Sequence, residues 1–331
     1  MRFGLALPQY DYSVPSERPL QFDTIVEHAR VAAQSGFESV WLSDHLFLDI
    51  GKYGGPPDRE ACFDPVVTLA ALARRVPHVR LGTLVFCEAL RPAAVLAKAL
   101  ATLDRVCGGR LDVGLGAGWY EPEYADIGMT MPTPRIRLER LTEAVEVVKG
   151  VLAGGPFTFD GAHHRATEAP SLPPPLQLPR PRVFVGGKGD RLLRLVAQHA
   201  DGWNTCWSWT FDAYRERLQV LERECERVDR DPATVWRTLG LYALCGEDER
   251  DLARRFELLR INSPRGVLDG VDLAEFRVGK LVGTVDELRA QVAEWEGLGI
   301  ESLVLGAGVV PFQVTSTDDV AMLGSLCSWT R

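Results

Sequence analysis

Two adjacent side chains, Asp44 and His45, have the residue types for proton chemistry and directly follow the apolar run 39–42. A histidine at the end of a strand can donate or accept a proton near neutral pH, and a neighbouring aspartate could orient it or cap the loop. We therefore take both as candidate catalytic residues. The alternative, which the sequence leaves equally open, is a structural hydrogen-bonding pair where the strand passes into a loop.

A glycine-rich segment, GLGAGW at 114–119, could bring the backbone close to a ligand. It departs from the dinucleotide-binding pattern G-x-G-x-x-G because Trp119 replaces the last glycine, and we expect Pro122 to prevent a helix from following directly. We instead expect Gly116 and Ala117 to lie against a flat ring, with Trp119 as a wall. The alternative is a tight turn beside an ordinary buried tryptophan.

A second glycine-rich segment is formed by Gly186, Gly187, Lys188 and Gly189, between an apolar run and a helical pattern. Free N–H groups at the start of a helix attract an anion, and Lys188 adds a positive charge. This favours a phosphate site, with Asn204 at the end of the next apolar run as a neighbour. The alternative is a turn in which glycines serve only the backbone angles.

The elements that would position these residues are short apolar runs that alternate with longer amphipathic stretches. The apolar runs are 2–7, 39–42, 79–86, 110–115, 182–185, 202–204, 235–244 and 302–305. Eight strand-then-helix units predict an α/β fold, a (β/α)₈ TIM barrel in which catalytic groups gather at the carboxyl ends of the strands. An open doubly wound sheet is the alternative, but it predicts a phosphate-binding turn after the first strand, and residues 8–11 contain no glycine.

The chain is longer than the roughly 250 residues usual for such a barrel. We expect one barrel domain over 1–331, with insertions at 48–62, 154–181 and 261–280 that form a lid over the pocket. Residues 154–181 are rich in Gly and Pro and would hold a small hairpin around 157–164.

Composition narrows the functional classes. Apolar residues make up 46% and charged residues 25%, which is typical of a globular protein. The net charge of −8 and the lack of a Lys/Arg run argue against nucleic acid and anionic membrane as partners, and no apolar stretch is long enough to span a bilayer. The seven cysteines are scattered without a C-x-x-C pair, which favours reduced thiols in a cytoplasmic protein and argues against a metal site.

Several of these segments, in their order along the chain, carry a family resemblance. They are MRFGLALPQ, GFESVWLSDHL, VRLGTLVF, RPAAVLAKALATLDRVCGGRLDVGLGAGWYEPEY, VFVGGKGDRLLRLVAQHADGWN and LVGTVDELRAQVAEWEGLGIESLVL. Together they resemble the bacterial luciferase-like flavin and deazaflavin oxidoreductases over nearly the whole chain. The resemblance is greatest to the branch that uses coenzyme F-420, an 8-hydroxy-5-deazaflavin.

The resemblance implies where a cofactor would bind. The family carries a non-prolyl cis peptide in a bulge after the third strand, which supports the deazaflavin ring, and the corresponding bond here is Leu84–Val85. The phosphate tail of the cofactor would lie on the glycine loop 186–189. His45 would lie near the reactive carbon.

The resemblance also leaves the proton donor open at one position. Some deazaflavin dehydrogenases of the family have a glutamate where this chain has Trp119. His45 therefore becomes the leading candidate, with Glu121 and Glu123 in reserve.

The function implied is hydride transfer between reduced F-420 and a small organic substrate, in a homodimeric enzyme. One alternative is an FMN-dependent monooxygenase that uses oxygen and a separate flavin reductase. Its cofactor has the same ring shape and one phosphate, so the glycine loop does not separate the two. A second alternative is a non-catalytic relative that binds the cofactor without turnover.

Overall fold

The apolar runs become the strands of a closed barrel. A computed structural model describes residues 1–327. The barrel strands within these residues are β1 (Arg2–Ala6), β2 (Ser39–Leu42), β5 (Arg80–Thr83), β7 (Leu111–Gly116), β10 (Arg182–Gly186), β11 (Gly202–Thr205), β12 (Trp236–Gly246) and β14 (Ser302–Gly306). Each is parallel to its neighbours, and β14 pairs back with β1 in the register Phe3 to Leu303, which closes the ring. The predicted (β/α)₈ barrel is confirmed.

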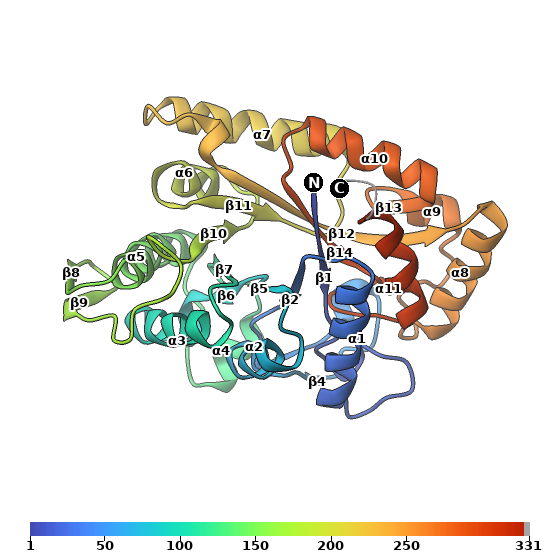
Figure 1. The fold of residues 1–331 in the computed structure, drawn as a ribbon, viewed down its shortest axis with the longest axis horizontal. Helices are drawn as coiled ribbons and strands as arrows, with labels where there is room; N and C mark the ends of the chain where they lie inside the picture. The colour runs from blue at the N-terminus through green and yellow to red at the C-terminus, as the bar shows by residue number, and fades with distance from the viewer. Residues whose placement is uncertain (328–331) are drawn as a thin grey trace.

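Amphipathic helices surround the strands, as Figure 1 shows. They are α1 (Phe22–Gln34), α2 (Pro65–Arg75), α3 (Ala93–Val106), α5 (Pro134–Leu152), α6 (Asp190–His199), α7 (Phe211–Glu226), α8 (Glu249–Asn262) and α10 (Val285–Gly297). Asp64 caps α2 by accepting from the Val67 N–H, and Thr284 with Glu287 forms a capping box at the start of α10. No helix in residues 1–327 has both the length and the apolar character needed to cross a membrane.

Shorter elements fill the connections. They are β3 (Phe47–Leu48), η1 (Gly51–Tyr53), β4 (Glu60–Ala61), β6 (Phe86–Cys87), η2 (Glu88–Leu90), α4 (Glu121–Asp126), β8 (Phe157–Asp160), β9 (Arg165–Ala169), η3 (Pro232–Thr234), α9 (Leu273–Arg277), β13 (Leu281–Thr284), α11 (Thr317–Leu323) and η4 (Gly324–Leu326). The predicted run 79–86 is divided, because β5 ends at Thr83 and β6 resumes pairing with β7 at the rim. The expected hairpin in 154–181 is present as β8 and β9 beside α5 (Figure 1).

Helix α4 corrects one expectation. Pro122 does not prevent a helix after the glycine-rich segment, because it occupies the first turn, where its missing N–H has no partner to lose. The helix turns Glu123 and Tyr124 toward the barrel rim, and both side chains are buried.

The interior of the barrel is filled by large aromatic side chains. Trp41 lies against Gly4 and Gly82 on the two adjacent strands, where a Cβ atom would collide with the indole. Its ring contacts Phe184 edge-on at 5.9 Å between centroids, and Phe184 in turn contacts Trp236 at 5.5 Å. The barrel centre is therefore a packed core, and a ligand has room only above it, at a rim.

A buried ionic cluster ties the β8–β9 hairpin to the barrel. The Glu88 carboxylate follows β6, is buried, and accepts from Arg140 Nη2 and His164 Nε2, both at 2.9 Å. Burial alone would raise the pKa of Glu88, but the hydrogen bonds from His164 and Arg140 outweigh it and hold the pKa below its ordinary value. The charged form is therefore the one that the fold stabilises.

We expect Glu88→Gln to lower the free energy of unfolding at pH 7 by about 1.5–3 kcal/mol, because a neutral amide replaces a charged acceptor. Since the folded pKa is depressed, this contribution is complete above the unfolded pKa of about 4.3 and is lost as the pH falls through the folded pKa. Urea unfolding at pH 7 measures the first effect, and a series from pH 7 down to about pH 2 measures the second, because the loss occurs below the unfolded pKa. Glu139→Gln, an exposed carboxylate 3.6 Å from His163, is the control and should change little. Equal losses in the two variants would contradict this account.

Candidate active site

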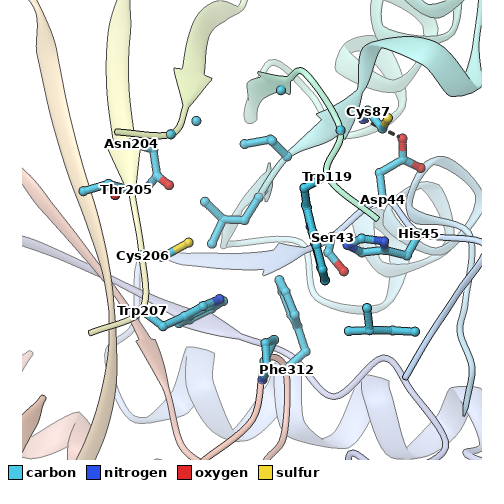
Figure 2. A pocket seen from close by; sticks show the side chains of 18 of the residues that line it. Ser43, Asp44, His45, Cys87, Trp119, Asn204, Thr205, Cys206, Trp207 and Phe312 are labelled. Atoms are coloured by element: carbon cyan, nitrogen blue, oxygen red, sulfur yellow. Dashed lines mark hydrogen bonds between the residues drawn. The ribbon is translucent and has the colours of Figure 1, made fainter. Parts of the chain in front are cut away.

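A cavity of about 400 Å³ lies at the carboxyl ends of the barrel strands, the rim predicted to carry the chemistry (Figure 2). Most of the residues selected from the sequence line it. They are Asp44, His45, Leu84, Val85, Gly116, Trp119, Gly186, Gly187, Lys188 and Asn204. Glu123, held in reserve as an acid, lines it as well.

Two selected positions lie outside the cavity lining. Ala117 follows Gly116 along an extended segment, so its side chain turns to the opposite face and packs on the core outside the barrel. Gly189 is the N-cap residue of α6, and its carbonyl accepts from the Leu192 and Leu193 amides. Glu121 is also outside the lining, exposed at the start of α4.

The insertions contribute unequally to the cavity. Segment 48–62 supplies Leu48, Lys52 and Tyr53, whereas 154–181 and 261–280 supply no lining residue. Segment 154–181 connects a helix to the next strand. Its hairpin lies beside α5 on the outside of the barrel, and only its later part, where Gln177 contacts Asp104, lies at the opposite end. The expectation that all three segments cover the pocket is therefore wrong.

His45 is held by Glu123 rather than by its neighbour in sequence. His45 Nδ1 lies 2.8 Å from Glu123 Oε2, and the second carboxylate oxygen accepts from the Leu46 N–H. Because a carboxylate only accepts, Nδ1 carries the hydrogen of this bond, and the neutral ring presents a lone pair at Nε2. Nε2 has no hydrogen-bond partner among residues 1–327 and is free to exchange a proton with a ligand in the cavity.

Asp44 supports the strand ends instead of orienting His45. Its carboxylate accepts from Arg91 Nη1 at 2.7 Å and from the Cys87 N–H at 3.0 Å. Burial raises the pKa of Asp44 even though Arg91 opposes the shift. Of the two interpretations of the Asp44–His45 pair, the contacts of Asp44 fit the structural one, and His45 remains the candidate for proton chemistry.

The floor of the cavity is formed by the backbone on either side of one valine. The Leu84–Val85 peptide is cis, as the family resemblance implied. Gly116 and Gly186 flank Val85, and a Cβ on either would come within 2.5 Å and 2.9 Å, respectively, of its methyl groups. The floor therefore has no side chain other than Val85 between these strands, which is the shape that a planar ring requires.

The glycine loop at the edge of this floor offers an anion site. Gly187, at φ +143°, donates its N–H to the Asn204 carbonyl at 2.9 Å, and Trp203 Nε1 donates to the Gly187 carbonyl at 2.7 Å. Helix α6 then begins at Asp190 without a side-chain cap. The Gly187 amide is thus occupied, and Asp190 in the first turn pairs with Arg217 at 2.7 Å. Lys188 forms no ion pair with any described residue, so its charge can attract a phosphate near the start of α6.

Neutral hydroxyl groups complete the polar wall beside His45. Tyr10 Oη lies 2.5 Å from Ser43 Oγ, which donates to Gln9 Oε1 at 2.9 Å. Burial raises the pKa of Tyr10 well above its ordinary value, so the phenol keeps its proton. These groups can orient a ligand, and they leave His45 as the side chain suited to proton exchange.

Other lining residues were not among the candidate site residues selected from the sequence. They are Tyr10, Ser43, Leu48, Lys52, Tyr53, Cys87, Gly118, Tyr124, Thr205, Cys206, Trp207, Pro311 and Phe312. Several directly follow a strand, so the rule that selected His45 could also have selected Cys206 after β11 and Phe312 in the loop after β14.

The sequence matches the luciferase-like monooxygenase family over residues 1–302. The chain belongs to this family. The expected relationship is thereby confirmed, and all lining residues of the cavity except Pro311 and Phe312 lie within the matched range.

The proteins to which this chain is similar are named for two different chemistries. The chain is 30% identical over 317 residues to the F420-dependent hydroxymycolic acid dehydrogenase of Mycobacterium tuberculosis, covering 92% of this chain and 82% of that protein. The crystal structure of monooxygenase RslO1 from Streptomyces bottropensis superposes with a TM-score of 0.76 at 25% identity, covering 98% and 97% of the two chains. An F420-dependent secondary alcohol dehydrogenase, solved with an F420-acetone adduct, shares the fold with a TM-score of 0.77 at 19% identity, over 100% and 99% of the chains.

Proposed function

We propose that this luciferase-like protein is an F-420-dependent oxidoreductase that transfers a hydride between reduced deazaflavin and a small organic substrate. The observation that carries the proposal is a glycine-lined floor in one cavity with the His45–Glu123 pair and with Lys188, which forms no ion pair with any described residue. The F420-dependent relative at 30% identity supports the choice of cofactor.

The described residues fit such a cofactor. The backbone at Leu84 and Val85, with Gly116 and Gly186 on either side, would hold the ring, and Lys188 with the start of α6 would hold the phosphate. When bound, F-420 supplies a two-electron carrier that gives or takes a hydride.

In this proposal, a side chain of the protein transfers the proton that accompanies the hydride. Neutral His45 can accept a proton at Nε2 from a substrate hydroxyl, and protonated His45 can return it to a carbonyl oxygen. Glu123 keeps the ring in one orientation and keeps the hydrogen on Nδ1 throughout. Trp119, whose ring centroid is 5.7 Å from that of His45, shields this side of the imidazole.

We expect Glu123→Gln to lower kcat/KM by about 10–100-fold, because an amide can donate to Nδ1 and move the ring hydrogen to Nε2. The F-420 dissociation constant should stay within about threefold, since Glu123 is not on the floor. Glu121→Gln is a matched control, because this carboxylate is two residues away and exposed. Equal rates in the two variants would show that Glu123 does not position His45.

An FMN-dependent monooxygenase is the second candidate, favoured by the likeness to RslO1. Turnover with and without oxygen separates the two, because reduced flavin reacts with oxygen and reduced deazaflavin largely does not. We expect a carbonyl substrate to oxidise reduced F-420 anaerobically at the same rate as in air. Turnover that requires both reduced FMN and oxygen would overturn the proposal, and cofactor binding without any turnover would indicate the non-catalytic relative.

A further inference from the structure

The two charged side chains of the cavity that form no ion pair with any described residue are both positive. The chain has only five lysines, and two of them, Lys52 and Lys188, line this cavity. The two lining carboxylates are already engaged, Asp44 with Arg91 and Glu123 with His45. In a protein of net charge −8, this arrangement makes the cavity a local site for anions.

Lys52 is separate from the glycine loop. It belongs to η1 in segment 48–62, and its Nζ lies 3.2 Å from the centroid of the Trp119 ring and 4.8 Å from that of Tyr53. It forms no ion pair with any residue in the described part of the chain. Burial lowers the pKa of Lys52, so a bound anion would compensate a cation that has lost part of its hydration.

The wall around Lys52 is aromatic. Figure 2 shows Trp119 on one side of the cavity, with Trp207 and Phe312 across from it. Trp207 is braced by stacking on Tyr242 at 5.3 Å and by an edge contact with Phe312 at 5.5 Å. Trp119 is 45% exposed, and such indole surfaces favour flat unsaturated ligands.

We propose that the substrate is a planar aromatic carboxylate, bound with its carboxylate on Lys52 and its ring between Trp119 and Trp207. This inference rests on the proposed function, because it assigns Lys188 to the cofactor phosphate and leaves Lys52 for the substrate. The ring would lie beside His45, which adjoins Trp119.

Calorimetric titration with a matched pair of probes tests this assignment. The probes are 2-naphthoate and 2-naphthamide, which share ring and size and differ in charge. Each is titrated into the wild-type protein with and without saturating F-420, whose own dissociation constant is measured first. We expect 2-naphthoate to bind at least about tenfold more tightly than 2-naphthamide, as is typical of a charge-assisted hydrogen bond.

The Lys52→Gln variant should abolish this preference while leaving 2-naphthamide and F-420 affinity unchanged. Lys98→Gln, an exposed lysine on α3, is the control and should keep the preference. The inference would be overturned by any of three results. The wild type binds both probes equally, it binds neither probe, or the Lys52→Gln variant keeps the preference for 2-naphthoate. A Lys52→Gln variant with weakened F-420 binding would assign Lys52 to the cofactor and also overturn it. If the wild type does not bind F-420, the proposed function is rejected. The proposal about Lys52 is still tested in that case, because the two probes are also compared without cofactor.

Discussion

Replacing His45 by alanine is expected to lower kcat/KM by about 10²–10⁴-fold, the range typical of a lost general acid–base group. The imidazole is the side chain of the cavity that combines a free ring nitrogen with a fixed orientation, set by the 2.8 Å contact to Glu123. The floor at Val85 does not include His45, so the F-420 dissociation constant should change by no more than about threefold. Steady-state oxidation of reduced F-420 by the best carbonyl substrate measures the rate.

His45→Asn is the informative companion variant. Its amide can still donate to Glu123, but it cannot exchange a proton near neutral pH. We expect its rate to match that of His45→Ala. If kcat/KM falls by less than about threefold in both variants, His45 does not take part in proton transfer. If kcat/KM is restored in His45→Asn, His45 only positions its neighbours.

Replacing Asp44 by alanine is expected to lower the free energy of unfolding by about 3–5 kcal/mol, the usual cost of breaking a buried ion pair from one side. The carboxylate is buried and holds both Arg91 and the Cys87 amide. Without the Asp44 carboxylate, the Arg91 guanidinium keeps only its ion pair with Asp64, whose Oδ2 lies 2.6 Å from Arg91 Nη2.

Asp64→Ala provides the matched control, because the same guanidinium pairs with this more exposed carboxylate. Its cost should be about 1 kcal/mol, mostly from the lost N-cap of α2. Urea unfolding of both variants gives the comparison. If the Asp44→Ala protein is as stable as the wild type and loses as much activity as His45→Ala, Asp44 has a catalytic role and not a structural one.

The barrel was predictable because its signals are local. Alternating apolar runs and caps such as Thr284 with Glu287 mark the strands and helices without knowledge of the tertiary structure. The rule that strand ends carry chemistry then selected His45 and the loop from Gly186, which do line one cavity.

The partners of these residues were not predictable in the same way. Glu123 lies 78 positions from His45 and reaches it only through α4, a helix that the sequence analysis excluded because of Pro122. Lys52 lies in an insertion, where no periodic pattern fixes the direction of a side chain. Ala117 was placed in the site although backbone alternation turns it away from Gly116.

Equilibrium titration with F-420 and FMN, on the wild type and on Lys188→Gln, determines which cofactor the cavity binds and whether Lys188 holds its phosphate. We expect saturable F-420 binding that Lys188→Gln weakens by about tenfold or more, the effect of removing one charge-assisted phosphate contact. Tight FMN binding with no affinity for F-420, or F-420 binding indifferent to Lys188, would contradict it.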